Sequence, residues 1–596
     1  MSSTHLFSKL LAILTLKTHK ATVFWFSLSL LLAIIYGWLG LQQAFEHDFV
    51  VQDDARQHIF WMQRYVDPEL FPNDLIADYF QSAAPVGYTT LYKAAAVLGI
   101  EPGFFGKILP FFLSVITAGY GFVLSLELFP VPVSGFFSSV ILTQTLWASD
   151  EISSGTPRAF LYPLIIAFIY YLLRRSHLIS LLLLALQVVL YPPIALVSLG
   201  LVAIRLVHWQ HGRLSLSQDW RDYALFAAGF CLIGGLTFYL KSLSGFGSIV
   251  TRSEALQMPE FQEKGRNAFF LPGLRYWLDG YPGRSGIFHR RMTIPGTLLA
   301  GTFLPIVLSL PLKTPLRQQV KPSIYSLVQL LVVSLGLYAI AQLLLFQLHV
   351  PSRYTSHTIR LVLAFAAGIF WVIFIDDIFR LGQFGQRSWG QKKTVIHRLL
   401  ATLSTVFPLF LTAALFVVTF FYYPLLIKDY PKAGYRESPE AQPIYAFFSE
   451  QPKDTLIASL SSEADNISTF SARSVLVSKE HALAYHQDYY AQIRQRAMDL
   501  LEAQYSENPS SVSQFIQNYD IDFWLLDKDA FEADYIAENK WLRQFQPVAE
   551  ASSASLEQGA VPILEQAIPN CTVLDANAWI ILESQCVAQF AADLNS

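Results

Sequence analysis

Long apolar runs recur along the first 427 residues, and they limit the folds open to this chain more than any other feature. About 20 consecutive apolar residues suffice to cross the hydrocarbon core of a membrane as a helix. Runs of that length, or slightly shorter, lie near residues 21–42, 107–127, 133–148, 157–173, 177–191, 193–207, 223–241, 294–311, 323–346, 359–377 and 399–424. The sequence therefore predicts an α-helical polytopic membrane protein with about 11 transmembrane helices.

The basic residues of the short connections indicate how these helices are oriented. Lys and Arg gather at residues 9–20, 174–175, 205–221, 313–321 and 380–398. Cytoplasmic connections carry an excess of such residues, so all of these groups lie inside if the N-terminus is cytoplasmic and the first run is a retained helix. An odd number of spans then places residues 43–106 and 242–292 outside, together with the C-terminal residues. We expect a protein of a bacterial inner (plasma) membrane.

The composition changes at residue 428. Residues 1–427 hold 31 Lys and Arg against 20 Asp and Glu, whereas residues 428–596 hold 11 against 25. The C-terminal stretch alternates short β-type runs such as DFWLL with helical ones, which is typical of an α/β domain. The sequence predicts a transmembrane body over residues 1–427 and an extracytoplasmic α/β domain over residues 428–596. It contains no phosphate-binding loop, dinucleotide-binding fingerprint or zinc-type Cys/His spacing.

The first outer loop, residues 43–106, carries nine acidic residues against three Lys and Arg, so it cannot lie in lipid. Its aromatic residues recur at spacings that suit short amphipathic helices at the membrane interface. On the first of these helices we expect Asp53, Asp54 and His58 to share a face, because positions three to five apart are neighbours. A carboxylate pair beside an imidazole at the membrane surface is a candidate site.

The second outer loop, residues 242–292, holds seven Lys and Arg against four acids, although it is expected outside. A solvated loop is one explanation, because long loops cross a membrane regardless of charge. The other is a bound anion such as phosphate, which Arg holds by bidentate contacts. The candidates lie in YPGRSGIFHRR, and they are Arg284, His289 and Arg290.

Several segments together resemble the GT-C superfamily of polytopic glycosyltransferases, which includes bacterial protein O-mannosyltransferases and aminoarabinose transferases. An acidic outer loop with Asp53-Asp54 directly follows the first span. The segment Thr156–Arg175 is similar to membrane helices of bacterial members, and Val350–Gly368 is similar to their P-x-R-Y segment. The loop pair reads Asp-Asp where several members have Asp-Glu, which leaves open which carboxylate corresponds.

The resemblance implies transfer of a sugar from a polyprenyl-phosphate donor to a lipid, glycan or protein acceptor on the outer face. Such transfer needs a base, and Asp53 is expected in this role narrowly ahead of Asp54, with a pKa raised by the like charge beside it. His58 would orient the base or share its role, or join both carboxylates around a divalent metal ion. Substrate contacts are expected from Arg56, Asp74, Asp78, Arg353, Tyr354 and His357, with Asp150 and Glu151 as secondary candidates.

Two other functions stay open on the sequence alone. One is a transporter or flippase of lipid-linked glycans, and the other is a non-catalytic membrane assembly protein. A transporter would place ionisable residues at mid-membrane depth in several spans, whereas these apolar runs are nearly free of them.

The chain has three cysteines. Cys231 lies in an apolar run and is expected to be a small core residue. Cys571 and Cys586 flank two β-type runs around a turn, so they would face each other and can pair in an oxidising compartment.

Overall fold

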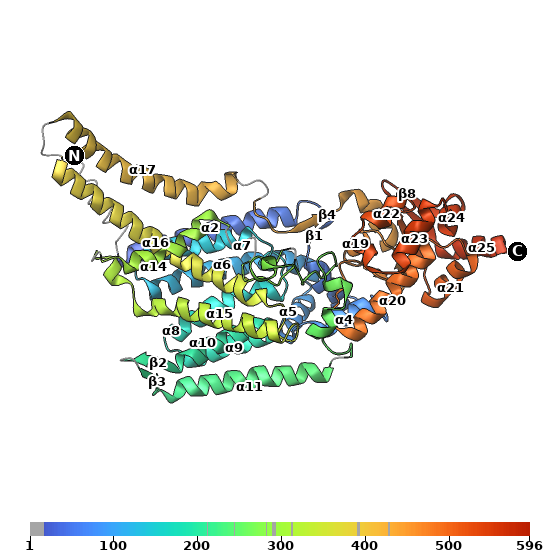
Figure 1. Ribbon diagram of the computed structural model, residues 1–596, viewed down its shortest axis with the longest axis horizontal. Coiled ribbons are helices and arrows are strands. Elements are labelled where there is room, and N and C mark those ends of the chain that lie inside the picture. The colour runs from blue at the N-terminus through green and yellow to red at the C-terminus, as the bar shows by residue number, and fades with distance from the viewer. Residues whose placement is uncertain are drawn as a thin grey trace.

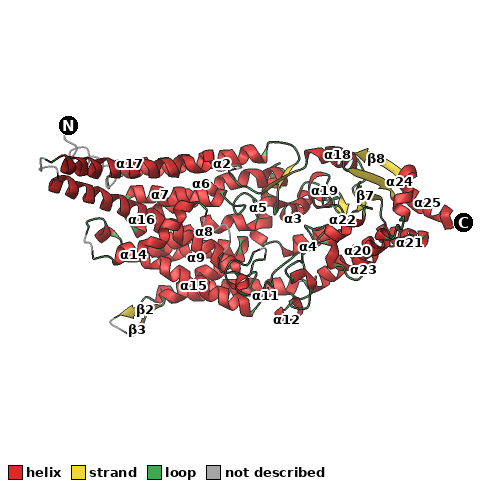
Figure 2. Ribbon diagram, turned by 45° about the horizontal axis from the view of Figure 1, so that its top comes forward, coloured by secondary structure: helices red, strands yellow, loops and turns green. Residues whose placement is uncertain are grey.

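The structure is a computed structural model that describes residues 17–210, 213–243, 245–281, 283–288, 294–311, 314–389, 394–426 and 430–595. The molecule is elongated, with a bundle of long helices at one end and the C-terminal residues, in orange and red, at the other (Figure 1). The hairpin of β2 (Val207–Gln210) and β3 (Arg213–Leu216) lies at the far end of the bundle (Figure 2). The opposite loops of the bundle therefore meet the C-terminal residues.

Helices form at all of the predicted apolar runs. They are α2 (His19–Ala44), α6 (Pro102–Leu128), α7 (Pro132–Trp147), α8 (Leu161–Leu173), α9 (His177–Leu190), α10 (Pro192–Arg205), α11 (Trp220–Leu243), η5 (Gly296–Phe303) with α14 (Leu304–Ser309), α15 (Tyr325–Leu343), α16 (Ser352–Trp389) and α17 (Val395–Leu426). Within the described residues, five are long and apolar enough to cross a membrane: α2, α6, α15 with its preceding turn, α16 and α17. The chain is thus an integral membrane protein. The number of spans stays a prediction, because α8, α9, α10 and α14 are shorter.

Local chemistry fixes where the helices at this end begin. Pro157 opens the turn η2 (Pro157–Phe160) and Pro192 opens α10, positions where the missing N–H of proline leaves no hydrogen bond unmade. The Glu101 carboxylate accepts the N–H groups of Gly103 (2.8 Å) and Phe104 (2.6 Å), which begins α6. The loops that surround the candidate site therefore end where η2 and α10 begin.

The first outer loop contains more than the expected short helices. Its elements are β1 (Val50–Gln52), α3 (Ala55–His58), η1 (Phe60–Tyr65), α4 (Leu75–Ala83) and α5 (Val86–Val97). Strand β1, which the sequence pattern did not predict, pairs antiparallel with β4 (Tyr435–Glu437), and Val51 lies opposite Arg436. The ring of Tyr79 in α4 stacks on that of Tyr489, with centroids 3.6 Å apart. The loop is therefore fastened to the C-terminal residues.

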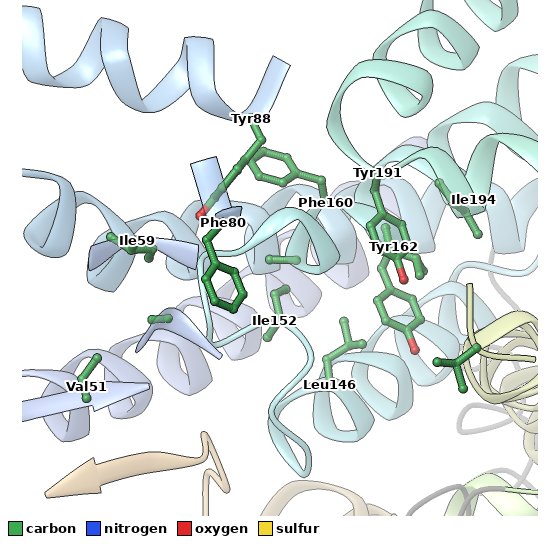
Figure 3. Packing of buried hydrophobic residues seen from close by; sticks show 14 of the residues in the cluster. Val51, Ile59, Phe80, Tyr88, Leu146, Ile152, Phe160, Tyr162, Tyr191 and Ile194 are labelled. Atoms are coloured by element: carbon green, nitrogen blue, oxygen red, sulfur yellow. The ribbon is translucent and has the colours of Figure 1, made fainter. Parts of the chain in front are cut away.

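Buried apolar side chains also fasten this loop to the bundle. Figure 3 shows Val51, Ile59 and Phe80 of the loop in one packed region with Leu146 of α7 and the nearby Ile152. Each of these side chains is less than one-tenth exposed. Burial of such a side chain stabilises the folded protein by roughly 1.5–3 kcal/mol, so packed apolar side chains hold the loop that carries the charged residues in place.

The C-terminal residues contain a mixed sheet with strand order β6-β5-β7-β9-β8. The strands are β5 (Leu456–Ala458), β6 (Ser474–Val475), β7 (Phe523–Asp527), β8 (Thr572–Ala576) and β9 (Trp579–Glu583). β5 runs parallel to β6 and β7, whereas β9 runs antiparallel to β7 and β8. The accompanying helices are α18 (Gln442–Ser449), α19 (Ala464–Phe470), α20 (Gln487–Gln504), α21 (Pro509–Tyr519), α22 (Ala533–Glu538), α23 (Val548–Glu557), α24 (Ile563–Cys571) and α25 (Ser584–Asn595). The boundary at residue 428 and the outer location stay predictions.

The cysteines divide into one pair and one single residue. Cys571, at the end of α24, and Cys586, in α25, face each other across the β8–β9 hairpin, as their spacing predicted, and they form a disulfide, which the sequence had left open. The expectation that Cys231 lies in a core is wrong, because its side chain is exposed on α11. α11 packs against α9 and α10 at the margin of the bundle and leaves its other side uncovered (Figure 1).

Candidate active site

A cavity of 1020 Å³ lies where the outer loops of the bundle meet the C-terminal residues. A cavity of this volume is large enough for a sizeable substrate. The residues that line it include Asp53, Asp54, Arg56, His58, Arg158, Tyr191, Arg266, Arg284, His349, Arg353, Arg436, Asp465 and Glu480. The cavity is therefore built from segments that lie far apart in the sequence.

The two aspartates of the first loop lie just before α3, and the side chain of Gln52 caps the start of this helix in their place. The Gln52 Oε1 atom accepts the N–H groups of Asp54 (2.8 Å) and Ala55 (3.2 Å). The Asp54 carboxylate makes no capping hydrogen bond of its own. It is consequently free to face the cavity.

Asp54 forms an ion pair with Arg158, which lies in the turn η2. Arg158 also donates to the backbone oxygen of Asp150 at 3.0 Å. Burial raises the pKa of Asp54, but the positive charges of Arg158, Arg284 and Arg353 outweigh burial and hold this pKa at about 2. The expectation of a raised pKa from the neighbouring aspartate is wrong for Asp54, because arginines from three other segments surround it.

Two of these arginines differ from Arg158 in their pairing. Among the described residues, neither Arg284 of the second loop nor Arg353 at the start of α16 forms an ion pair, although both line the cavity. The Nε atom of Arg353 and the hydroxyl of Tyr191 are buried and have no hydrogen-bond partner in the part of the chain that the structure describes. Buried donors are usually satisfied. This end of the cavity thus offers positive charge and unused donors to an anion.

The imidazoles in this part of the cavity are neutral at pH 7. Burial, together with the nearby charges of Arg158 and Arg353, lowers the pKa of His58 to about 4 against the attraction of Asp54. Burial and the charges of Arg353 and Arg284 lower the pKa of His349 to about 3. Both rings can exchange hydrogen bonds there, but the arginines supply the positive charge.

Asp53 turns the other way, toward the C-terminal residues. It is in ion pairs with Arg56 and with Arg436, whose Nε lies 2.9 Å from its Oδ1. Arg56 continues to Glu480 at 3.2 Å, and Arg266 of the second loop reaches the same carboxylate at 3.1 Å. Asp53 therefore belongs to a charge network that joins both outer loops to the C-terminal residues.

Several residues expected to bind substrate do not line this cavity. The Asp74 carboxylate caps α4 by accepting the Ala77 N–H at 2.8 Å, and Asp78 pairs with Arg64 at 2.7 Å. The Tyr354 hydroxyl donates to a backbone oxygen. His357 does not line the cavity either. His289 and Arg290 lie outside the described residues.

His357 belongs to a buried polar cluster that the sequence pattern did not predict as one group. The Glu151 Oε2 atom lies 3.2 Å from His357 Nδ1 and 2.6 Å from Arg360 Nη1, and the Tyr162 hydroxyl donates to it at 2.6 Å. The sequence indicated Glu151 as a secondary candidate for substrate contact, but Arg360, Tyr162 and Arg158 were not among the predicted site residues. Arg158 had the same sequence signal as Arg353, a cation beside the outer end of an apolar run.

Asp53, Asp54 and His58 do not fit a metal site. Each carboxylate is paired with at least one arginine, and the positive charge around Asp54 would repel a cation. Within the described residues, one His/Asp group has atoms close enough to hold a metal ion, within 4.8 Å of one another, and it lies elsewhere. It consists of His177, Asp219 and Asp222.

Comparison with known proteins identifies the fold. No family model and no curated protein sequence matches the chain. Among solved structures, the oligosaccharyltransferase AglB of Archaeoglobus fulgidus, in complex with an inhibitory peptide and a dolichol-phosphate, aligns with a TM-score of 0.52 and 10% identity over 88% of this chain and 72% of its own. ArnT from Cupriavidus metallidurans bound to undecaprenyl phosphate aligns over 94% and 98%, with a TM-score of 0.45 and 11% identity.

The alignment with AglB decides the architecture. The chain has a GT-C fold. The fold expected from the first loop and the late span is thereby confirmed, although the sequences share few residues. At 10% identity the likeness concerns the GT-C fold and assigns no role to any side chain.

Proposed function

We propose that this protein is a membrane glycosyltransferase that uses a polyprenyl-phosphate-linked sugar and works in the cavity around Asp54. One observation carries the proposal: Arg284 and Arg353, which form no ion pair among the described residues, lie in one cavity with the charged carboxylate of Asp54. Transfer of a sugar from a lipid phosphate needs both elements, because a phosphate leaves and a proton is lost. The GT-C fold, and the dolichol-phosphate in the AglB complex, agree with such a donor.

The chemistry follows from the charges. The acceptor's nucleophilic atom attacks the anomeric carbon, and the bond from that carbon to the phosphate oxygen breaks. The phosphate keeps the bonding electrons as an anion, which Arg284 and Arg353 stabilise. The acceptor's proton passes to the Asp54 carboxylate.

Donor binding would also improve Asp54 as a base. Arg284 and Arg353 help hold its pKa at about 2, so the free carboxylate is a weak base. A phosphate that pairs with the same arginines cancels part of their field and adds a like charge, and both effects raise the pKa of Asp54. We therefore assign the base to Asp54 rather than Asp53, whose carboxylate is engaged by Arg56 and Arg436.

The direct test is transfer of a labelled sugar from a polyprenyl-phosphate donor by the purified protein. Arg353→Ala should weaken donor binding about tenfold to a hundredfold, because a charge-assisted contact to phosphate is worth roughly 1.5–3 kcal/mol. Arg64→Ala is the matched control, because Arg64 belongs to the first loop but pairs with Asp78 outside the cavity. Parent-like donor affinity in Arg353→Ala would refute the phosphate assignment, and donor binding without transfer would favour a transporter.

A further inference from the structure

A second cavity, of 340 Å³, lies on the other face of the first outer loop. Along residues 50–63 the chain alternates between the two cavities. Asp53, Asp54 and His58 face the large cavity, whereas Gln52 and Phe60 line the small one. The first loop is therefore a wall shared by two separate cavities.

Two residues that line the small cavity, Phe45 and Phe104, lie at the ends of helices that are long enough to span a membrane. Phe45 directly follows α2 and is 44% exposed, and Phe104 lies in the first turn of α6 and is 48% exposed. Their ring centroids are 5.5 Å apart, and the Lys107 ammonium lies 5.1 Å from the Phe45 ring centroid. Phenylalanine rings exposed at the ends of membrane helices are sheltered from water when they lie at the boundary of headgroups and acyl chains. We therefore expect this side of the cavity to face lipid headgroups.

The polar lining of this cavity combines both signs of charge. Among the described residues, neither Lys107 nor Asp48 forms an ion pair or a side-chain hydrogen bond, and both line the cavity. The Glu101 carboxylate is already engaged by two backbone N–H groups of α6. Deeper in the wall, Gln52 is only 3% exposed, and its Nε2 donor has no hydrogen-bond partner among the described residues. A matching ligand would present an anion to Lys107 and a cation to Asp48.

We propose that this cavity binds the headgroup of a zwitterionic phospholipid with a primary ammonium. The phosphate lies against Lys107, the ammonium against Asp48, and the acyl chains pass over Phe45 and Phe104 into the membrane. A purely anionic headgroup fits less well, because Asp48 and Glu101 also line the cavity. In addition, Gln52 holds the N–H groups of Asp54 and Ala55, so bound lipid steadies the segment that carries Asp54. Only this last consequence rests on the proposed function.

The test measures lipid binding and needs no activity. The full-length protein is placed in phosphatidylcholine nanodiscs that contain a phosphatidylethanolamine analogue with a photoreactive group near its headgroup. After irradiation, mass spectrometry should find the label on peptides that cover residues 45–63 or 101–107. Unlabelled phosphatidylethanolamine should compete, and phosphatidylglycerol should compete at least tenfold less well.

Variants identify the groups that bind. Lys107→Gln and Asp48→Asn should each reduce labelling about tenfold, whereas Lys107→Arg should retain it. Lys93→Gln is the control, because Lys93 is exposed on α5 and lines neither cavity. Labelling that persists in both Lys107→Gln and Asp48→Asn, or equal competition by phosphatidylglycerol, would overturn the proposal. The same holds if Lys93→Gln reduces labelling as much as Lys107→Gln.

Discussion

Replacing Asp54 by Asn should change donor binding and turnover in opposite directions. The amide keeps the shape of the side chain but can neither accept the acceptor's proton nor carry a negative charge. Turnover should fall by roughly a hundredfold to ten-thousandfold, the usual contribution of a positioned base. The affinity for the polyprenyl-phosphate donor should rise, because the carboxylate no longer competes with the phosphate for the arginines.

The structure gives the size of both effects. The pKa of Asp54 is held at about 2 against an ordinary value of 3.8. A difference of this size corresponds to roughly 2 kcal/mol of net attraction between the carboxylate and its surroundings. Asp54→Asn should lose about this much stability. A carboxylate and a phosphate in one such cavity repel by about 1–2 kcal/mol, so the donor should bind roughly fivefold to thirtyfold more tightly.

The assay compares the parent protein with Asp54→Asn and Asp53→Asn. Donor affinity is measured by equilibrium binding, and turnover is measured at saturating donor with a labelled sugar. Asp53→Asn is the control, because it removes a neighbouring charge of the same loop that pairs with Arg56 and Arg436 instead. A loss of donor affinity in Asp54→Asn, or parent-like turnover, would refute the electrostatic argument. A larger loss of turnover in Asp53→Asn would transfer the base to Asp53.

The remaining predictions concern topology, pH and the disulfide. Cysteine labelling should find residues 428–596 outside and residues 383–393 inside, and finding both on one side would overturn the predicted orientation. The pKa of His58 is lowered from 6.5 to about 4, so as the pH falls the unfolded chain takes up a proton on His58 before the folded protein does. The unfolding temperature should therefore fall as the pH drops from about 6.5 to 4, and His58→Asn should flatten this dependence. Cys586→Ser should cost about 3 kcal/mol, as expected for a disulfide that closes a loop of 15 residues, and an unchanged melting temperature would contradict it.

The sequence was sufficient for features that arise from local pattern. Apolar length predicted where the helices form, since any helix of that composition must be sheltered from water. The resemblance of the first loop and of Val350–Gly368 predicted the GT-C fold, and the spacing of Cys571 and Cys586 predicted that they face each other. The candidate base, Asp53 or Asp54, and three of the arginines of the cavity, Arg56, Arg284 and Arg353, could likewise be named from residue type and position.

Other features depended on which distant segments come together, and only the tertiary structure decided them. Residue spacing suggested that Asp53 and Asp54 share one site, but the pairing of β1 with β4 brings Arg436 to Asp53, while the turn η2 brings Arg158 to Asp54. The sign of the pKa shift of Asp54 followed from this arrangement. Electrostatic energy depends on distances between charges in space, and the sequence gives only their order along the chain.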